Sequence, residues 1–143
     1  MKLAFYKNKE KLFNRAVCWW CNSKYSHVEV ILEELPDGLS RCASSSYSDH
    51  GVRIKNIDLK DGKWDIMEIS ANEDLVHAWF NKHLGENYDL LGLFGFIFRR
   101  GIQNKIEWFC SESVADAMGF EESWRYEPGV FATTCLRLGG KFL

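Results

Sequence analysis

A β-strand pattern is clearest in residues 25–32, which read YSHVEVIL. β-branched residues are concentrated in this stretch, and the turn-forming sequence Pro36-Asp37-Gly38 follows it. Side chains two residues apart in a strand face the same side, so His27 and Glu29 share one face. The stretch therefore predicts a strand that places a histidine beside a carboxylate.

Further strands are predicted on both sides of this stretch. Leu39–Tyr47 is a candidate hairpin partner, although its serines are weak strand formers. Alternating apolar and polar residues around a turn at Asp61-Gly62 predict two more strands. Together with a short N-terminal candidate, these strands are Lys2–Tyr6, Val52–Ile57 and Trp64–Ile69. The middle of the chain therefore predicts a small antiparallel sheet.

Apolar residues at helical spacing predict helices around this sheet. A capping box of Ser70 and Glu73 marks the start of one of them. The predicted helices are Lys9–Trp20, the segment from Ser70 to Leu84, a buried helix at Leu90–Phe98, and Cys110–Met118. Val130–Leu138 fits either a strand or a loop. We therefore predict the α+β class, with a small antiparallel sheet packed against helices.

Composition limits the domain organisation and the function classes. The 143 residues are 46% apolar, have a net charge of −2 and contain no Gly/Ser linker or repeat, which predicts one ordered domain over residues 1–143. The lysines and arginines are scattered rather than gathered into one stripe, so we expect no nucleic-acid partner. The longest apolar run, Leu90–Phe98, is too short to span a bilayer, and Lys7 comes too early for a secretory signal. We therefore expect a cytoplasmic protein with no transmembrane segment.

Cys110 is a candidate nucleophile. Five cysteines, an odd number, are expected to be reduced thiols in a cytosolic protein. Cys110 lies at a predicted helix start, where unpaired backbone N–H groups and the helix dipole stabilise a thiolate. The alternative is that Cys110 is a small buried apolar residue.

His27 is the candidate base among four histidines. The other three, His50, His77 and His83, fall in a turn or on a helix surface. A strand fixes the imidazole of His27, and Glu29 can orient it. A cysteine at a helix start that faces a histidine on an adjacent strand is the dyad of papain-type enzymes.

Four blocks occur along the chain in a defined order. They are YSHVE at 25–29, SSSYSDHGVR at 44–53, Tyr88-Asp89, and FCSE at 109–112. Together they resemble the YiiX/YebB-like cysteine hydrolases, which belong to the circularly permuted branch of the NlpC-type papain-like superfamily, as does lecithin:retinol acyltransferase. Similar short forms occur in tailed phages. The resemblance runs from about residue 19 to 126 and implies a circularly permuted papain-like fold.

The resemblance also assigns roles to residues. It makes Cys110 the nucleophile and His27 the general base, and it places a third polar residue, which orients the imidazole, at Ser46 or Ser44. A serine is a weaker orienter than the charged or imidazole groups that relatives often carry. Glu29 is the alternative orienter, unless it is a surface residue on an edge strand.

Tyr88 matches a tyrosine that binds the oxyanion in the unpermuted relatives. A fixed phenol beside the Cys110 backbone N–H stabilises the negative charge that forms on an attacked carbonyl oxygen. The alternative is a packed tyrosine with a satisfied hydroxyl. Asp89 is expected to cap the following helix and is not counted as catalytic.

Two other features have simpler explanations. The sequence Cys18-Trp19-Trp20-Cys21 has CxxC spacing, but no second pair supplies the remaining zinc ligands, and the motif lies at a helix end. We therefore expect no metal and no organic cofactor.

The tryptophans at helical spacing are expected to be core residues rather than an interface. The apolar run Leu90–Phe98 is a buried helix by default and a candidate groove wall by its nearness to Tyr88.

The expected function is acyl transfer to water through Cys110, by cleavage of an amide, ester or thioester bond. The candidate substrates are peptides, peptidoglycan peptides and acyl lipids, and the apolar run leans slightly toward acyl groups. One alternative is a catalytically silent binding or virion-associated module, because a serine at the third position is weak. Another is a phage effector directed at a host protein. The expected location is a bacterial or phage-infected cell, or the virion.

Overall fold

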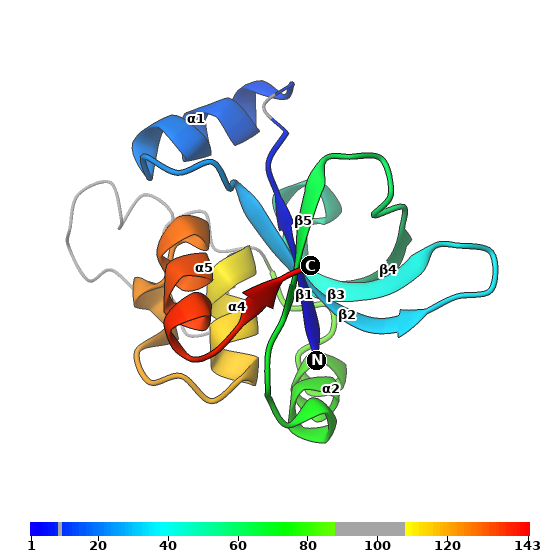
Figure 1. Ribbon diagram of the computed structural model, residues 1–143. Coiled ribbons are helices and arrows are strands. Elements are labelled where there is room, and N and C mark those ends of the chain that lie inside the picture. The colour runs from blue at the N-terminus through cyan, green and yellow to red at the C-terminus, as the bar shows by residue number, and fades with distance from the viewer. Residues whose placement is uncertain (9, 88–107) are drawn as a thin grey trace.

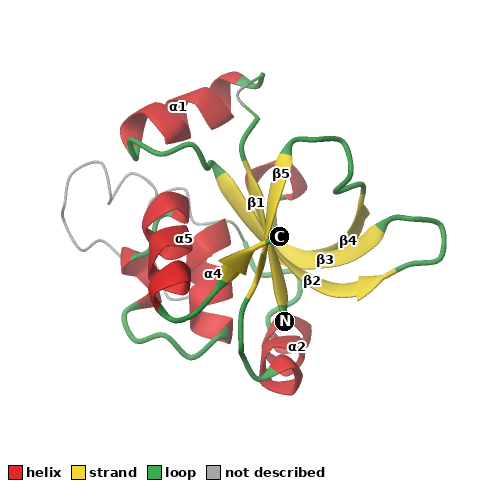
Figure 2. Cartoon of the chain, in the orientation of Figure 1, coloured by secondary structure: helices red, strands yellow, loops and turns green. Residues whose placement is uncertain are grey.

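The computed structural model describes residues 1–8, 10–87 and 108–143. Within these ranges the chain forms a six-stranded antiparallel sheet in the order β4-β3-β2-β1-β5-β6 (Figures 1 and 2). The strands are β1 (Lys2–Tyr6), β2 (His27–Glu34), β3 (Ser40–Ser46), β4 (Gly51–Ile57), β5 (Trp64–Glu68) and β6 (Lys141–Phe142). The predicted α+β class and the antiparallel sheet are confirmed, including the serine-rich strand β3.

Four α-helices occur in the described ranges. They are α1 (Leu12–Trp20), α2 (Glu73–Lys82), α4 (Cys110–Ala117) and α5 (Pro128–Arg137). Helix α4 contacts strands β2 and β3 as well as helices α2 and α5, whereas α1 stands apart from these helices (Figure 1). No helix in the described ranges is long and apolar enough to cross a membrane.

The apolar core lies between the sheet and three of the helices. The register pairs Leu3 with Val30 and Phe5 with Val28, and these side chains are at most 1% exposed. Helices α2, α4 and α5 complete the core with Phe80, Val114 and Phe131. Full burial of one such side chain contributes roughly 1.5–3 kcal/mol. This packing fixes α4 against the sheet.

The opposite face of β2, β3 and β4 carries the polar residues. Side chains alternate along a strand, so His27 and Glu29 face away from Val28 and its core partners. The β2–β3 pairing puts Val30 opposite Ala43. Extended by up to three residues along both strands, it places Glu29 opposite Ser44 and His27 opposite Ser46. Arg53 in β4 is paired with Ser44. Three neighbouring strands therefore bring these polar residues together.

Helix α5 corrects the prediction for Val130–Leu138, which is helical rather than a strand or a loop. Pro128 stands at the first helical turn, where its missing N–H costs nothing. The Glu127 side chain accepts hydrogen bonds from the backbone N–H groups of Gly129 and Val130. This cap and the burial of one face outweigh the low helix propensity of the β-branched residues.

The start of α2 is also corrected. The N-cap is Asn72, whose Oδ1 accepts a hydrogen bond from the Leu75 backbone N–H at 3.2 Å, so the predicted capping box of Ser70 and Glu73 is wrong. Asparagine is at least as good an N-cap as serine, and it stands one residue before the helix.

Helix α1 differs from expectation in what it exposes. Trp19 and Trp20, which were expected in the core, are 78% and 46% exposed. The predicted helix Leu90–Phe98, with Tyr88 and Asp89 just before it, lies outside the described residues.

Candidate active site

Cys110 is the first residue of α4 and is 4% exposed. The first intrahelical hydrogen bond runs from the Ser113 N–H to the Phe109 carbonyl at 3.0 Å. The N–H groups of Cys110 and Ser111 therefore have no helical carbonyl to bind. They are available to stabilise a thiolate, or an oxyanion formed on a substrate.

Strand β3 anchors the start of α4 through serine side chains. The Ser113 hydroxyl donates to the Cys110 carbonyl at 2.8 Å and accepts from the Ser45 N–H at 3.3 Å. The Ser45 hydroxyl donates to the Trp108 carbonyl. These hydrogen bonds fix the backbone on both sides of the thiol.

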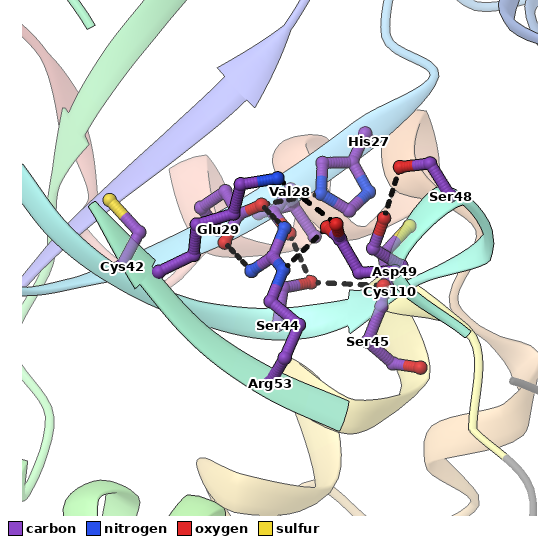
Figure 3. Close-up of polar contacts among 12 residues, drawn as sticks. His27, Val28, Glu29, Cys42, Ser44, Ser45, Ser48, Asp49, Arg53 and Cys110 are labelled. Atoms are coloured by element: carbon purple, nitrogen blue, oxygen red, sulfur yellow. Dashed lines mark hydrogen bonds and ion pairs between the residues drawn. The ribbon is translucent and has the colours of Figure 1, made fainter. Parts of the chain in front are cut away.

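His27 is the first residue of β2, and its ring lies between two site residues. Its Nε2 is 2.7 Å from Glu29 Oε1, and the Cys110 side chain lies near enough to the ring to raise its pKa. Because Nε2 is engaged by Glu29, Nδ1 is the ring nitrogen left for the thiol. Figure 3 shows the three side chains clustered at this end of the sheet. The predicted dyad residues are therefore neighbours in space.

Charge is balanced within this cluster. Burial lowers the pKa of His27, but the Cys110 side chain and the Glu29 carboxylate outweigh it and raise the pKa to about 9. Burial raises the pKa of Glu29, but Arg53 and His27 outweigh it and lower the pKa to about 2. Imidazolium and carboxylate therefore coexist at neutral pH, and His27 holds a proton that it can give to a leaving group.

Glu29 is fully buried in the interior strand β2, not a surface residue on an edge strand. Arg53 holds it with two hydrogen bonds, one from Nη1 to Oε2 at 2.6 Å and one from Nη2 to Oε1 (Figure 3). Asp49 accepts from Arg53 Nε at 3.0 Å and from Lys55 Nζ at 3.0 Å. This chain of alternating charges satisfies both Glu29 oxygens, which a buried carboxylate requires.

Arg53 and Asp49 are site residues that sequence reasoning missed. Arg53 meets Glu29 from two strands away, across β3, so no local pattern links them. The only signal is a basic residue in the strand after the Gly51 turn, in register with Ser44. Only the strand order shows that this basic residue lies across β3 from Glu29.

The two serine candidates have other partners. The Ser44 hydroxyl donates to the Val28 carbonyl at 2.7 Å, and the Ser46 hydroxyl lies 3.0 Å from that of Ser48. Among Ser44, Ser46 and Glu29, the carboxylate is the one bonded to the imidazole. Glu29 therefore has the geometry of the orienting residue. Tyr88, the candidate oxyanion donor, lies outside the described residues.

A cleft of about 570 Å³ opens beside His27. Two aromatic pairs flank it, Tyr6 with Trp64 at 4.7 Å between ring centroids and Phe13 with Tyr47 at 5.0 Å. Ser26, His27 and Ser46 also line this cleft. The buried Ser26 hydroxyl has no hydrogen-bond partner in the described residues.

Three of the other cysteines have thiols with a raised pKa. Burial raises the pKa of Cys42 and Cys135 to about 12, and burial together with the Glu127 carboxylate does the same for Cys21. Such thiols are poor nucleophiles. In the described ranges no group of three or more His, Cys, Asp or Glu side chains is arranged to hold a metal ion.

Comparison with protein-family models and with curated proteins gives no match. The site must therefore be interpreted from its own geometry. A thiol at a helix start, a neighbouring imidazole and a carboxylate bonded to one nitrogen of that imidazole can together perform nucleophilic acyl transfer.

Proposed function

We propose that the protein is a cysteine hydrolase or acyltransferase that cleaves an amide, ester or thioester bond. The observation that carries this proposal is the cluster of Cys110, His27 and Glu29, in which the carboxylate lies 2.7 Å from the imidazole and the thiol stands at the start of α4. Three groups of these types in this order match the roles of nucleophile, acid/base and orienter.

The reaction proceeds in two steps. In the first, the Cys110 thiolate bonds to the acyl carbon, and backbone N–H groups at the start of α4 stabilise the oxyanion. The bond to the leaving group then breaks, and that group takes the proton of the His27 imidazolium. In the second step, His27 removes a proton from water, which attacks the thioester and releases the acid and the thiolate. An acceptor other than water makes the second step an acyl transfer.

The fold proposal is a circularly permuted papain-like domain. Its support is the chain order, in which the histidine strand β2 precedes the cysteine helix α4, as the resemblance to the YiiX/YebB-like hydrolases requires. The aromatic pairs beside His27 provide apolar walls for an acyl chain or for the side chains of a peptide, including a peptidoglycan peptide.

A catalytically silent binding module is the second candidate. The observation that favours it is the burial of Cys110, which is 4% exposed and does not line the cleft among the described residues. On this alternative the cleft binds a ligand, and the thiol only packs against the sheet.

Alkylation by iodoacetamide at neutral pH, mapped to each cysteine by mass spectrometry, separates the two candidates. If the dyad is functional, Cys110 reacts faster than the more exposed Cys21, and His27→Ala slows it about tenfold or more. His77→Ala, on α2 outside the site, is the matched control and leaves the rate unchanged. A Cys110 that reacts no faster than Cys21, or that ignores the loss of His27, contradicts the hydrolase and favours the binding module.

A further inference from the structure

Helix α1 exposes an apolar surface that the rest of the described chain does not cover. Leu12 is 80% exposed, Trp19 78% and Trp20 46%, whereas only Val17 and Cys18 are buried. Leu12 and Trp19 are seven residues apart and lie on one side of the helix, with the exposed Ala16 between them. The indoles of Trp19 and Trp20 touch edge to face at 5.9 Å. Large apolar groups gathered in this way mark an interaction surface.

The same segment is basic in an otherwise acidic protein. Residues 7–24 contain five basic residues, Lys7, Lys9, Lys11, Arg15 and Lys24, and one acidic residue, Glu10. Their net charge is +4, so the remainder of the chain carries −6 to give the total of −2. An anionic partner is therefore attracted to this end of the molecule and repelled by the rest.

Two of these five basic side chains, one at the N-cap of α1 and one in its first turn, can bind such a partner. Lys7 and Lys24 are paired with Asp65 at 2.6 and 2.9 Å. Lys11 and Arg15 are exposed, and no carboxylate of the described residues pairs with either. Both lie next to the stripe of Leu12 and Trp19, so cationic and apolar groups are exposed close together.

From this surface we infer that α1 docks on an anionic lipid bilayer. Tryptophan is suited to the membrane interface because its ring is apolar and its N–H is polar, and lysine and arginine bind the anionic headgroups. A second copy of the chain fits less well, because two α1 surfaces placed face to face would oppose like charges.

Sedimentation with vesicles tests this inference independently of any enzymatic activity. We expect the full chain to bind vesicles of phosphatidylcholine mixed with phosphatidylglycerol and not vesicles of phosphatidylcholine alone. The double variant Trp19→Ser/Trp20→Ser should weaken binding about tenfold or more. Lys11→Gln and Arg15→Gln should each weaken it about fivefold, and high salt should release the protein.

The matched control is Leu75→Ser/Leu138→Ser, which removes two comparably exposed apolar side chains, 64% and 61% exposed, outside α1. It should bind like the unchanged protein. Failure to bind anionic vesicles, or equal loss in the control and the tryptophan variant, overturns the inference. A dimer detected by light scattering and lost in the tryptophan variant also overturns it, because the surface is then occupied by a second copy.

Discussion

Helices α1 and α4 are similar in length but are held in opposite ways. Seven of the eight residues of α4 are buried, whereas α1 buries two of nine. From their sequences alone, α1 would be expected to be the more buried helix. Its sequence (LFNRAVCWW) is the more apolar, whereas that of α4 (CSESVADA) is half polar or acidic. Burial therefore follows the available partners rather than the apolar content of each segment.

This contrast in burial suggests different roles for α4 and α1. At the start of α4, the buried Ser113 hydroxyl is hydrogen-bonded to β3 and to the Cys110 carbonyl, which holds the thiol beside His27. Around α1, apolar and basic groups remain available to an outside partner. The structure thus combines a candidate active site held by hydrogen bonds with a peripheral helix that is mostly exposed. Four predictions test this division, beginning with the largest effect.

Glu29→Ala should be the most destabilising change, because it removes the buried carboxylate that neutralises both His27 and Arg53. Breaking a buried pair from one side costs about 3–5 kcal/mol of unfolding free energy. Glu34→Ala removes the exposed carboxylate that pairs with Lys2 at the other end of β2, and it should change the stability very little. Urea unfolding of both variants measures the contrast. Equal losses would show that the buried charges do not stabilise the site.

The stability should also fall at alkaline pH through His27. Its folded pKa is raised above the usual 6.5 to about 9. The stabilisation from its charged form is therefore complete below about pH 6.5 and is lost as the pH rises to about 9. The loss is on the order of 3 kcal/mol. Urea unfolding at a series of pH values should show this decline, and His27→Gln should flatten it. A decline of the same size in His27→Gln would assign it to other groups.

Ser113→Ala should weaken the anchor of α4. The change removes the hydroxyl that binds the Cys110 carbonyl and leaves the buried Ser45 N–H without its acceptor. An unsatisfied buried donor costs about 1–3 kcal/mol. Thr133→Ser, on the exposed side of α5, keeps its hydroxyl bond to the Gly129 carbonyl and should be near neutral. The rate of Cys110 alkylation should fall along with stability, and an unchanged rate would remove Ser113 from the positioning of the thiol.

The sequence predicts the parts of this structure that depend on local pattern. Alternation around His27 gives β2 and sets His27 and Glu29 on the same side, and their contact at 2.7 Å confirms that neighbourhood. Cys110 at the start of a helix is likewise visible from the run of residues that follows it. Each prediction rests on the geometry of a few consecutive residues.

The rest depends on contacts between distant segments. Arg53 reaches Glu29 only because β4 and β2 flank the same strand, an arrangement that spacing along the chain does not specify. The serines of β3 were candidate orienters by position, but their hydroxyls bind Val28 and Ser48 instead. In α1, apolar spacing predicted burial, although only two residues find partners within the described chain.

The smallest effect is expected for Trp19→Ser, although tryptophan is the largest side chain that can be removed. Trp19 is 78% exposed, so its loss should change the unfolding free energy by about 0.5 kcal/mol or less. Val114→Ala in α4 removes far fewer atoms from a fully buried site and should cost more, about 1–2 kcal/mol. Thermal or urea unfolding of the two variants compares them directly. If Trp19→Ser costs as much as Val114→Ala, α1 is packed by the chain itself and is not a free docking surface. If the order holds, the stability of the fold does not depend on Trp19, as a docking surface on α1 requires.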